Sequence, residues 1–353
     1  MPVLSQLTLL NLRNISELSL QPAMGINLIT GDNGSGKTSI LEAIHLLALG
    51  RSFRTRSLKN VVQFDQQQFQ VVAKIKAETP VGLQFNINTG LQIRLNNAPL
   101  KKLSELAMQL PLQLIPANCH QFFEQGPRYR RQLLDWGLFH VEPSFNYHWQ
   151  SYRKVLQQRN SALRQRKKVD EIQLWDSHLA LHGEAINTHR KKQLGLLLEH
   201  FEQVFPRLCP EFRDGSFTIK YRTGWPKDLL LEAALHSTIE RDRQLGYTRS
   251  GCHAADWSFR VNELDPSEVF SRGQQKLFFL ALCMAQAKMT EFVNHQNSIL
   301  LLDDISSELD QDHQNNVLNE LATLPVQSFI TTTEIEGKIG DEIELFHVKQ
   351  GVI

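Results

Sequence analysis

Residues 31–38 read Gly31-Asp32-Asn33-Gly34-Ser35-Gly36-Lys37-Thr38 and meet every position of the pattern G-x-x-x-x-G-K-[ST]. The apolar alternation of residues 25–30 predicts a strand before this turn, and residues 39–49 predict a helix after it. In that context the glycines let backbone N–H groups close around phosphate oxygens, and the helix N-terminus adds a positive dipole. Lys37 reaches the β- and γ-phosphates, and Thr38 offers its hydroxyl to Mg²⁺. The segment therefore predicts binding of a nucleoside triphosphate.

The composition is that of an ordinary globular protein. The 353 residues are 41% hydrophobic, which is enough for a large core or a pair of packed lobes. Even the longest apolar runs, at 277–284 and 298–302, are too short to span a bilayer, and the N-terminus lacks a secretory signal, so we expect a cytoplasmic protein without membrane contact. The four cysteines are far apart and form no C-x-x-C pair, which favours reduced structural thiols over a zinc site or disulfides.

The charge balance excludes a uniformly basic coat for nucleic acid. The 38 basic and 37 acidic residues leave a formal net charge of +1, so any site for a polyanion must be a local patch. Three clusters of cations are candidates: Arg51, Arg54, Arg56 and Lys59; Arg128, Arg130 and Arg131 around Tyr129; and Arg159, Arg164, Arg166, Lys167 and Lys168. A solvated surface is an equal alternative for each cluster, because charge runs on helices are common.

The order of predicted elements indicates an inserted lobe. Strands are expected at 4–12, 69–76, 81–88 and 91–95, with a hairpin turn at Asn96-Asn97, and a helical pattern runs from 135 to 205 until Pro206 and Pro210 end it. A short strand at 217–221 and a polar stretch at 241–260 follow, before helix and strand alternate again. We therefore expect residues 1–117 and 298–353 to form the nucleotide-binding lobe and residues 118–297 a mainly helical second lobe.

Two carboxylates complete the predicted triphosphate site. Residues 298–302 form a buried-strand pattern that closes with Asp303 and Asp304. Asp303 is the candidate Mg²⁺ ligand, and Asp304 is the candidate to orient or deprotonate an attacking water. The alternative is a plain hydrophobic strand that enters an Asp-rich turn. The next residues, 306–310, are small and acidic and suit a loop that crosses a subunit interface.

A second phosphate-binding surface is predicted 32 residues ahead of Asp303, in Ser271-Arg272-Gly273-Gln274-Gln275-Lys276. Ser271 is placed as the N-cap of a helix over 277–289, and Gly273 lets an anion approach the backbone. One ATP cannot readily be held by two distant helix N-termini of the same lobe. We therefore expect this surface, within the second lobe, to meet the triphosphate of a partner molecule.

These motifs, in this order, resemble the head of ABC-type P-loop ATPases. The resemblance implies an α/β fold, with a mixed β-sheet and helices, and an inserted mainly helical lobe without a long coiled coil. Within that class the chain resembles the RecF family across nearly its whole length. The segments that carry this resemblance are residues 12–14, 34–39, 41–43, 50–54, 126–127, 130–131, 134–135, 271–274, 303–304 and 307–310.

The RecF resemblance implies a weak, DNA-associated ATPase that dimerises head to tail around ATP and Mg²⁺ and clasps DNA until slow hydrolysis releases it. It implies recognition of gapped DNA, at junctions of single and double strand, and help in loading RecA together with RecO and RecR in recombination and repair. Transferred to this chain, the roles are ATP binding by Gly31, Asp32, Asn33, Gly34, Ser35, Gly36, Lys37, Thr38 and Ser39, catalysis by Lys37 and Asp304, Mg²⁺ binding by Thr38 and Asp303, and binding of the partner's γ-phosphate by Ser271, Gly273 and Gln274. Arg51 or Arg54 is a candidate for a phosphate or DNA contact.

Three segments depart from the family patterns. Thr331-Thr332-Thr333 ends the predicted strand 326–330, and one of these hydroxyls is expected where ABC transporters carry histidine. In the interlobe loop the family usually carries Gln or Glu after a proline, whereas here Pro116 is followed by Ala117-Asn118. Asn118 and Gln121 are therefore only weak candidates for the residue of this loop that senses ATP. The family pattern Gly-Pro-His-x-x-Asp is altered in this chain to Gly251-Cys252-His253-Ala254-Ala255-Asp256. His253 and Asp256 alone are too few ligands for a metal site.

Three other functions compete with this interpretation. A transporter ATPase subunit would require a histidine after the final strand, where this chain has Thr331-Thr332-Thr333. A chromosome-organising protein would need long coiled-coil arms, and the segment between Lys37 and Asp303 is too short and irregular for them. A small-molecule kinase is disfavoured by the segment that begins at Ser271.

Overall fold

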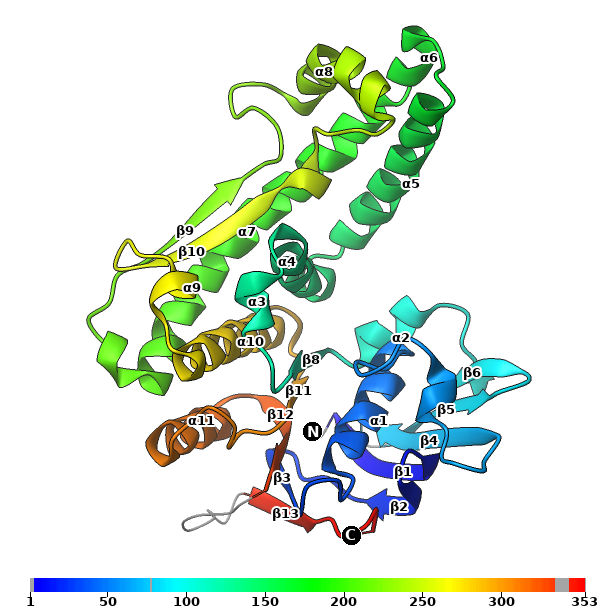
Figure 1. The fold of residues 1–353 in the computed structure, drawn as a ribbon, viewed down its shortest axis with the longest axis vertical. Coiled ribbons are helices and arrows are strands. Elements are labelled where there is room, and N and C mark those ends of the chain that lie inside the picture. Colours follow the sequence, from blue (N-terminus) through cyan, green and yellow to red (C-terminus); the bar gives the residue numbers. More distant parts are fainter. Residues whose placement is uncertain (1–2, 77, 334–342, 353) are drawn as a thin grey trace. The chain divides into compact units, whose positions relative to one another are not determined.

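The computed structural model describes residues 3–76, 78–333 and 343–352. Figure 1 shows a chain of two compact units. Unit 1 comprises Met1–Cys119, Val204–Arg213 and Arg272–Ile353, and unit 2 comprises His120–Gln203 and Asp214–Ser271. No helix in the described part of the chain has the length and apolar character needed to cross a membrane.

A parallel sheet of five strands forms the centre of unit 1. Its order is β13 (Ile343–His347), β3 (Ile26–Thr30), β12 (Val326–Thr332), β11 (Ser298–Leu302) and β8 (Leu112–Ile115). Every residue of β3, β11 and β12 is buried, as expected for strands whose apolar runs are covered on both faces. Because the strands are parallel, the segments that follow β3, β11 and β12 emerge at the same edge of the sheet.

An antiparallel sheet of six strands forms the rest of the β-structure in unit 1. Its order is β2 (Ile15–Leu20), β1 (Leu4–Leu12), β4 (Gln68–Ile75), β5 (Thr79–Asn86), β6 (Gly90–Leu95) and β7 (Ala98–Pro99). Helix α1 (Lys37–Leu49) is buried along nearly its whole length and shares one apolar core with residues of both sheets. It ends at Gly50, whose φ of 65° is the left-handed conformation that closes many helices. The η1 turn (Leu58–Val61) and α2 (Leu103–Gln109) complete this part.

The helix that contains most of the predicted phosphate-binding segment 271–276, which we call the signature, belongs to unit 1. Helix α10 (Arg272–Asn294) packs against β8 and β11, and its Phe278 ring meets Phe205 at 5.6 Å in an edge-on arrangement. Phe205 lies near the end of α7 (Asp176–Leu208), so the last turn of that helix also belongs to unit 1. Helix α11 (Gln311–Thr323) lies between β11 and β12 in the chain.

This division differs from the expected boundaries. The sequence placed residues 118–297 together in a second lobe that carries the signature, whereas the structure assigns α10 to the sheet that it packs against. Only Ser271, the residue directly before α10, lies in unit 2. The apolar face of α10 explains the difference, because a helix is grouped with the surface that buries it.

Unit 2 is mainly helical, as expected. It contains α3 (Gln121–Glu124), α4 (Pro127–Val141), α5 (Phe145–Arg164), α6 (Val169–Gln173), most of α7, α8 (Leu231–Leu245) and α9 (Pro266–Val269). The hairpin of β9 (Phe217–Arg222) and β10 (Asp256–Val261) is antiparallel, and η3 (Cys252–Ala254) precedes β10. Buried side chains of α4, α5, α7 and α8 form its core.

One helix boundary was predicted wrongly. Pro206 lies inside α7, which continues to Leu208. Proline removes one backbone donor, which is a small loss this close to a helix end, and the Cys209 N–H still donates to Phe205 O at 2.9 Å. Pro210 does mark the change of direction, because it opens the η2 turn (Pro210–Phe212).

Candidate functional site

The Gly31–Thr38 turn has the backbone geometry that its glycines allow. Gly31, Gly34 and Gly36 have φ values of 143°, 81° and 121°, which side chains rarely tolerate. A Cβ atom on Gly31 would also lie 2.2 Å from Val348 O, in the segment that follows β13. The conformation of this loop therefore depends on glycine at these positions.

Lys37 is folded back over that loop. Its Nζ donates hydrogen bonds to Gly31 O at 2.5 Å and Asp32 O at 2.9 Å. Burial lowers the pKa of Lys37, and the nearby carboxylates of Asp304, Asp32 and Asp303 oppose that shift. The structure thus holds a cation at the point where the sequence predicts the phosphates.

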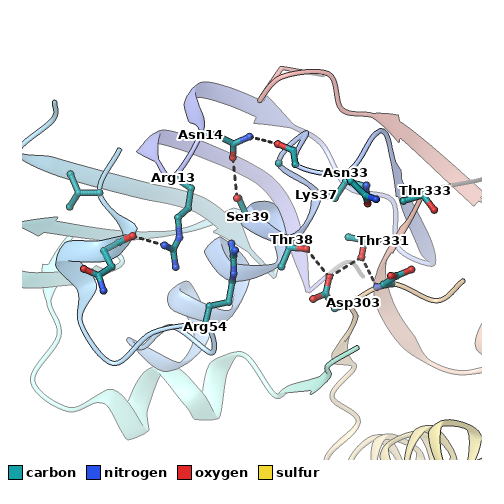
Figure 2. A pocket seen from close by; sticks show the side chains of 15 residues that line it. Arg13, Asn14, Asn33, Lys37, Thr38, Ser39, Arg54, Asp303, Thr331 and Thr333 are labelled. Carbon is teal, nitrogen blue, oxygen red and sulfur yellow. Dashed lines mark hydrogen bonds between the residues drawn. The ribbon is translucent and has the colours of Figure 1, made fainter. Parts of the chain in front are cut away.

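Figure 2 shows Thr38 and Thr331 converging on Asp303. Thr38 Oγ1 donates to Asp303 Oδ1 at 2.9 Å, and Thr331 Oγ1 donates to the same oxygen at 3.1 Å. The three residues come from the first turn of α1, the end of β12 and the residue after β11. A carboxylate beside a hydroxyl is an oxygen donor set that suits Mg²⁺. The predicted pair of metal ligands is therefore brought together.

Asp304 lies in a tight turn that is fixed from several directions. Its φ of 56° is left-handed, its N–H donates to Thr331 Oγ1 at 2.8 Å, and its Oδ1 accepts from Ser306 Oγ at 2.8 Å and from Ser307 N at 3.2 Å. One carboxylate oxygen thus stabilises the turn.

The buried ammonium of Lys276 binds the same turn through three hydrogen bonds. Its Nζ donates to Asp304 O at 2.6 Å, to Ser307 O at 2.6 Å and to Ser307 Oγ at 2.8 Å. Lys276 lies in the first turns of α10 and is only 3% exposed. The helix that carries the predicted signature is therefore tied directly to the turn that contains Asp304, a connection that the sequence did not reveal.

One cavity of about 530 Å³ brings together Lys37, Thr38, Asp303, Asp304 and Thr331, and its volume is in the range of small-molecule sites. Its lining residues are Arg13, Asn14, Asn33, Gly34, Gly36, Lys37, Thr38, Ser39, Arg54, Asn60, Val62, Asp303, Asp304, Thr331 and Thr333. Gly273 and Gln274 are not among them. Within one chain, the cavity therefore contains the glycine-rich loop and both carboxylates but neither of these signature residues.

Asn14 braces the phosphate loop from the turn between β1 and β2. Its Nδ2 donates to Gly34 O at 3.0 Å, and its Oδ1 accepts from Ser39 Oγ at 3.2 Å (Figure 2). The chain end adds a further contact, because Gly351 N donates to Ser35 O at 2.7 Å. Neither of these two contacts with the phosphate loop was predicted from the sequence.

A buried carboxylate organises the arginines beside the cavity. Glu42 of α1 is fully buried and receives Nε and Nη2 of Arg13, both at 2.8 Å. Ser52 Oγ also donates to Glu42, and Arg54 Nη1 reaches it at 3.5 Å. Arg54 keeps a partly exposed side chain and is the one member of the predicted cluster 51–59 that lines the cavity.

The other predicted basic residues fall into two groups. Arg51, Arg56 and Arg128 are exposed. In unit 2, Arg130 makes a bidentate contact with Asp256 at 2.9 and 3.0 Å, and Arg131 Nη1 donates to Ala255 O at 2.6 Å. These two arginines therefore already have partners within unit 2.

Arg159 belongs to the interior. It is fully buried and donates to Asp176 at 2.7 Å and to Asp242 at 2.8 Å, so the solvated surface considered for its cluster does not apply to this residue.

The remaining candidates have separate surroundings. His253 Nε2 donates to Thr248 O at 3.0 Å, whereas Asp256 is bound by Arg130 and Arg222, so the two residues are not joined in one site. Gln121 Oε1 accepts from Gln125, and neither Asn118 nor Gln121 lines the cavity.

Comparison with known proteins identifies the family of the chain. Residues 3–350 match the family model described as "RecF/RecN/SMC N terminal domain". A "DNA replication and repair protein RecF" of Nitrosococcus oceani is 40% identical over 99% of this chain and 98% of its own length. The chain belongs to the RecF family. A protein of the same name from Psychromonas ingrahamii is 37% identical over 99% of each chain.

Solved structures place the fold in the same family. The structure described as "the recombination mediator protein RecF-ATP in RecFOR pathway" matches with a TM-score of 0.85 and 27% identity, covering 99% of this chain and 96% of its own. An Smc head bound to the C-winged helix domain of ScpA matches with a TM-score of 0.59 at 14% identity over 94% of this chain and 90% of its own, which shows a shared fold. The expected ABC-type α/β head is therefore confirmed.

Proposed function

We propose that this chain is an ATP-dependent DNA-binding protein of recombination and repair, in which ATP binding closes a dimer on DNA and slow hydrolysis releases it. The observation that carries the proposal is the convergence of Thr38, Asp303 and Thr331 beside Lys37 in one cavity. RecF relatives named for DNA replication and repair, and a RecF structure solved with ATP, support it.

In this proposal the cavity residues divide the work of ATP hydrolysis. Lys37 neutralises charge on the β- and γ-phosphates, and Thr38 and Asp303 hold Mg²⁺, which would balance the remaining phosphate charge. Asp304 uses Oδ1 to keep its turn, so Oδ2 is the oxygen assigned to orient or accept a proton from water. Thr331 positions both aspartates through its hydroxyl, which donates to the Asp303 carboxylate and accepts from the backbone N–H of Asp304.

The second half of the ATP site is assigned to a partner chain. Gly273 and Gln274 do not line the cavity of their own chain, and Ser271 directly precedes the same helix. A γ-phosphate held by Lys37 of one chain and by Ser271 of another would link two molecules. Lys276 would then transmit the docking of that helix to the Asp304 turn.

DNA is the proposed partner of the exposed cations. Arg51, Arg54, Arg56 and Arg128 are available to phosphates, whereas Arg130 and Arg131 are engaged within unit 2. We further propose the finer roles that accompany RecF: action in the cytoplasm, a preference for gapped DNA and cooperation with RecO, RecR and RecA. A transporter subunit is not favoured, since Thr331 and Thr333 occupy the strand end where transporters carry histidine.

The test is ATP-dependent DNA binding measured by fluorescence anisotropy on a gapped duplex. Wild type should bind more tightly with Mg²⁺-ATP, and its affinity should fall steeply with salt as counterions return to the phosphates. Lys37→Met should lose the ATP stimulation, while Lys74→Met, on an exposed part of β4, should keep it. An equal ATP response of Lys37→Met and wild type would contradict the proposal.

A further inference from the structure

A cysteine, a glutamate and a histidine meet in unit 1, outside the ATP cavity. Among the described residues, Cys209, Glu211 and His313 form the group of potential ligands whose Sγ, carboxylate oxygen and imidazole nitrogen all lie within 4.8 Å of one another. Cys209 follows α7, Glu211 lies in η2, and His313 lies in the first turn of α11. Residues about 100 positions apart in the chain are thus brought to one point.

The distances are close to those of a tetrahedral zinc site. His313 Nε2 lies 3.7 Å from Glu211 Oε1. With zinc bonds of about 2.0–2.3 Å, neighbouring ligand atoms are about 3.5 Å apart. The nitrogen and the oxygen therefore need almost no movement, and the sulfur, which lies within 4.8 Å of both atoms, would move closer to them.

His313 is oriented by a second carboxylate, as metal-binding histidines commonly are. Its Nδ1 donates to Asp310 Oδ1 at 2.8 Å, which leaves Nε2 as the nitrogen that faces Glu211. Asp310 is itself fixed as the N-cap of α11, because the same oxygen accepts from His313 N at 2.9 Å. Gln274 Nε2 donates to Glu211 Oε1 at 3.2 Å and positions the second ligand. The donor atoms are thus supported by hydrogen bonds outside the group.

We propose that Cys209, Glu211 and His313 bind a divalent transition metal, with Zn²⁺ the best fit. Sulfur, imidazole nitrogen and carboxylate oxygen are the ligands that zinc takes in tetrahedral sites, and water completes the fourth position. The metal would join the end of α7 to the start of α11. It would therefore fix the segment 304–310 where it enters α11. Lys276 already holds the beginning of this segment through Asp304 O and Ser307 O.

The competing interpretation is a metal-free ion-pair cluster. In that case the Cys209 thiol donates to Glu211, and His313 is held between the carboxylates of Asp310 and Glu211. Both interpretations use the same contacts, so the distinction rests on whether the sulfur and the imidazole nitrogen bind metal together.

The test uses the full chain, freed of metal by a chelator and titrated without nucleotide with Zn²⁺, and with Co²⁺ as a spectroscopic probe. Wild type should bind a single Zn²⁺ per chain, gain thermal stability, and show a thiolate-to-cobalt absorption band. Cys209→Ser should lose that band, His313→Ala should lose the stability gain, and Asp310→Asn should weaken Zn²⁺ binding by about 10- to 100-fold.

Matched controls separate this site from other thiols, histidines and the ATP cavity. Cys283→Ala changes another buried cysteine of unit 1, and His295→Asn changes an exposed histidine, so both should bind Zn²⁺ as wild type does. Thr38→Ala, which alters the proposed Mg²⁺ ligands, should also leave Zn²⁺ binding intact. All variants should share the metal-free unfolding temperature of wild type within a few degrees. Absence of binding by wild type, or binding that survives both Cys209→Ser and His313→Ala, would overturn the proposal.

Discussion

Thr38 and Asp303 are 265 residues apart in the chain, yet the hydroxyl of Thr38 donates to the carboxylate of Asp303 at 2.9 Å. The parallel sheet creates this contact, because β3 and β11 both flank β12 and end at the same edge. Two segments that separately suggest phosphate and metal binding thereby form a single site.

The first prediction concerns this pair. Asp303→Asn and Thr38→Ala should each weaken binding of ATP in the presence of Mg²⁺ by about 10- to 100-fold, which corresponds to the loss of a charged or metal-bound contact. Thr38→Ser, which keeps the hydroxyl, should remain within a few-fold of wild type. Calorimetric titration with and without Mg²⁺ measures the effect, and equal affinities for all four proteins would contradict the assignment.

The second prediction concerns Lys276 as a positioning residue. Lys276→Met removes the ammonium that binds Asp304 O and Ser307 O and leaves these acceptors without it, so the free energy of unfolding should fall by about 2–4 kcal/mol. The rate of ATP hydrolysis should fall while KM for ATP changes little, because Lys276 does not line the cavity. Lys288→Met, on the same helix, serves as the control. A parallel rise in KM would show that Lys276 acts on ATP binding instead.

The third prediction separates exposed arginines from internal ones. The double variant Arg56→Ala with Arg128→Ala should weaken DNA binding and lower the salt slope by about one for each lost phosphate contact. Arg130→Ala should instead destabilise the protein by about 1–3 kcal/mol, since it leaves Asp256 with a weaker set of partners. Anisotropy and chemical denaturation of the same preparations distinguish the two effects. If the slope of log affinity against log salt concentration is unchanged in the double variant, DNA does not bind at Arg56 and Arg128.

The fourth prediction concerns acid stability. Burial lowers the pKa of His45 to about 4, and its Nδ1–H donates to Arg51 O at 2.7 Å. Because the unfolded chain binds the proton first, the contribution of neutral His45 is complete above pH 6.5 and is lost as the pH falls towards 4. That loss is roughly 2 kcal/mol at pH 5.

His45→Asn, whose amide can still donate to the Arg51 carbonyl, provides the comparison. Its free energy of unfolding should vary less than that of wild type between pH 6.5 and 4, as measured by denaturant titration. His140, whose pKa burial also lowers to about 4, should keep part of the acid sensitivity in this variant. Identical pH dependence in both proteins would contradict the assignment to His45.

Strongly apolar or strongly patterned segments could be predicted from the sequence. β3 has the apolar alternation and β11 the apolar run from which each strand was predicted, and the glycines of residues 31–36 have the positive φ values that their motif requires. The strands β2, β8 and β13 were not predicted. In β13 only Phe346 is buried, and the adjacent apolar residues Leu345 and Phe346 break the alternation that marks a strand. In β8 the apolar run is interrupted by Gln113, which pairs with Gln286 inside the core.

Contacts made by tertiary structure could not be predicted. Nothing near Lys276 in the sequence indicates that its ammonium binds carbonyls of residues 304 and 307, and nothing near Arg159 indicates its two buried carboxylate partners. The proximity of Cys209 and His313 could not be predicted either, because the spacing of the cysteines in the sequence argued against a metal site. Side chains that meet through packed helices leave no local pattern.

Sedimentation of Asp304→Asn reports whether ATP links two chains. The amide oxygen of asparagine can still accept from Ser306 and Ser307, so the turn should persist while hydrolysis is slowed. At micromolar protein with Mg²⁺-ATP, Asp304→Asn should sediment as a dimer, and as a monomer without nucleotide or when combined with Lys37→Met. A monomer in saturating Mg²⁺-ATP would show that ATP does not link two chains.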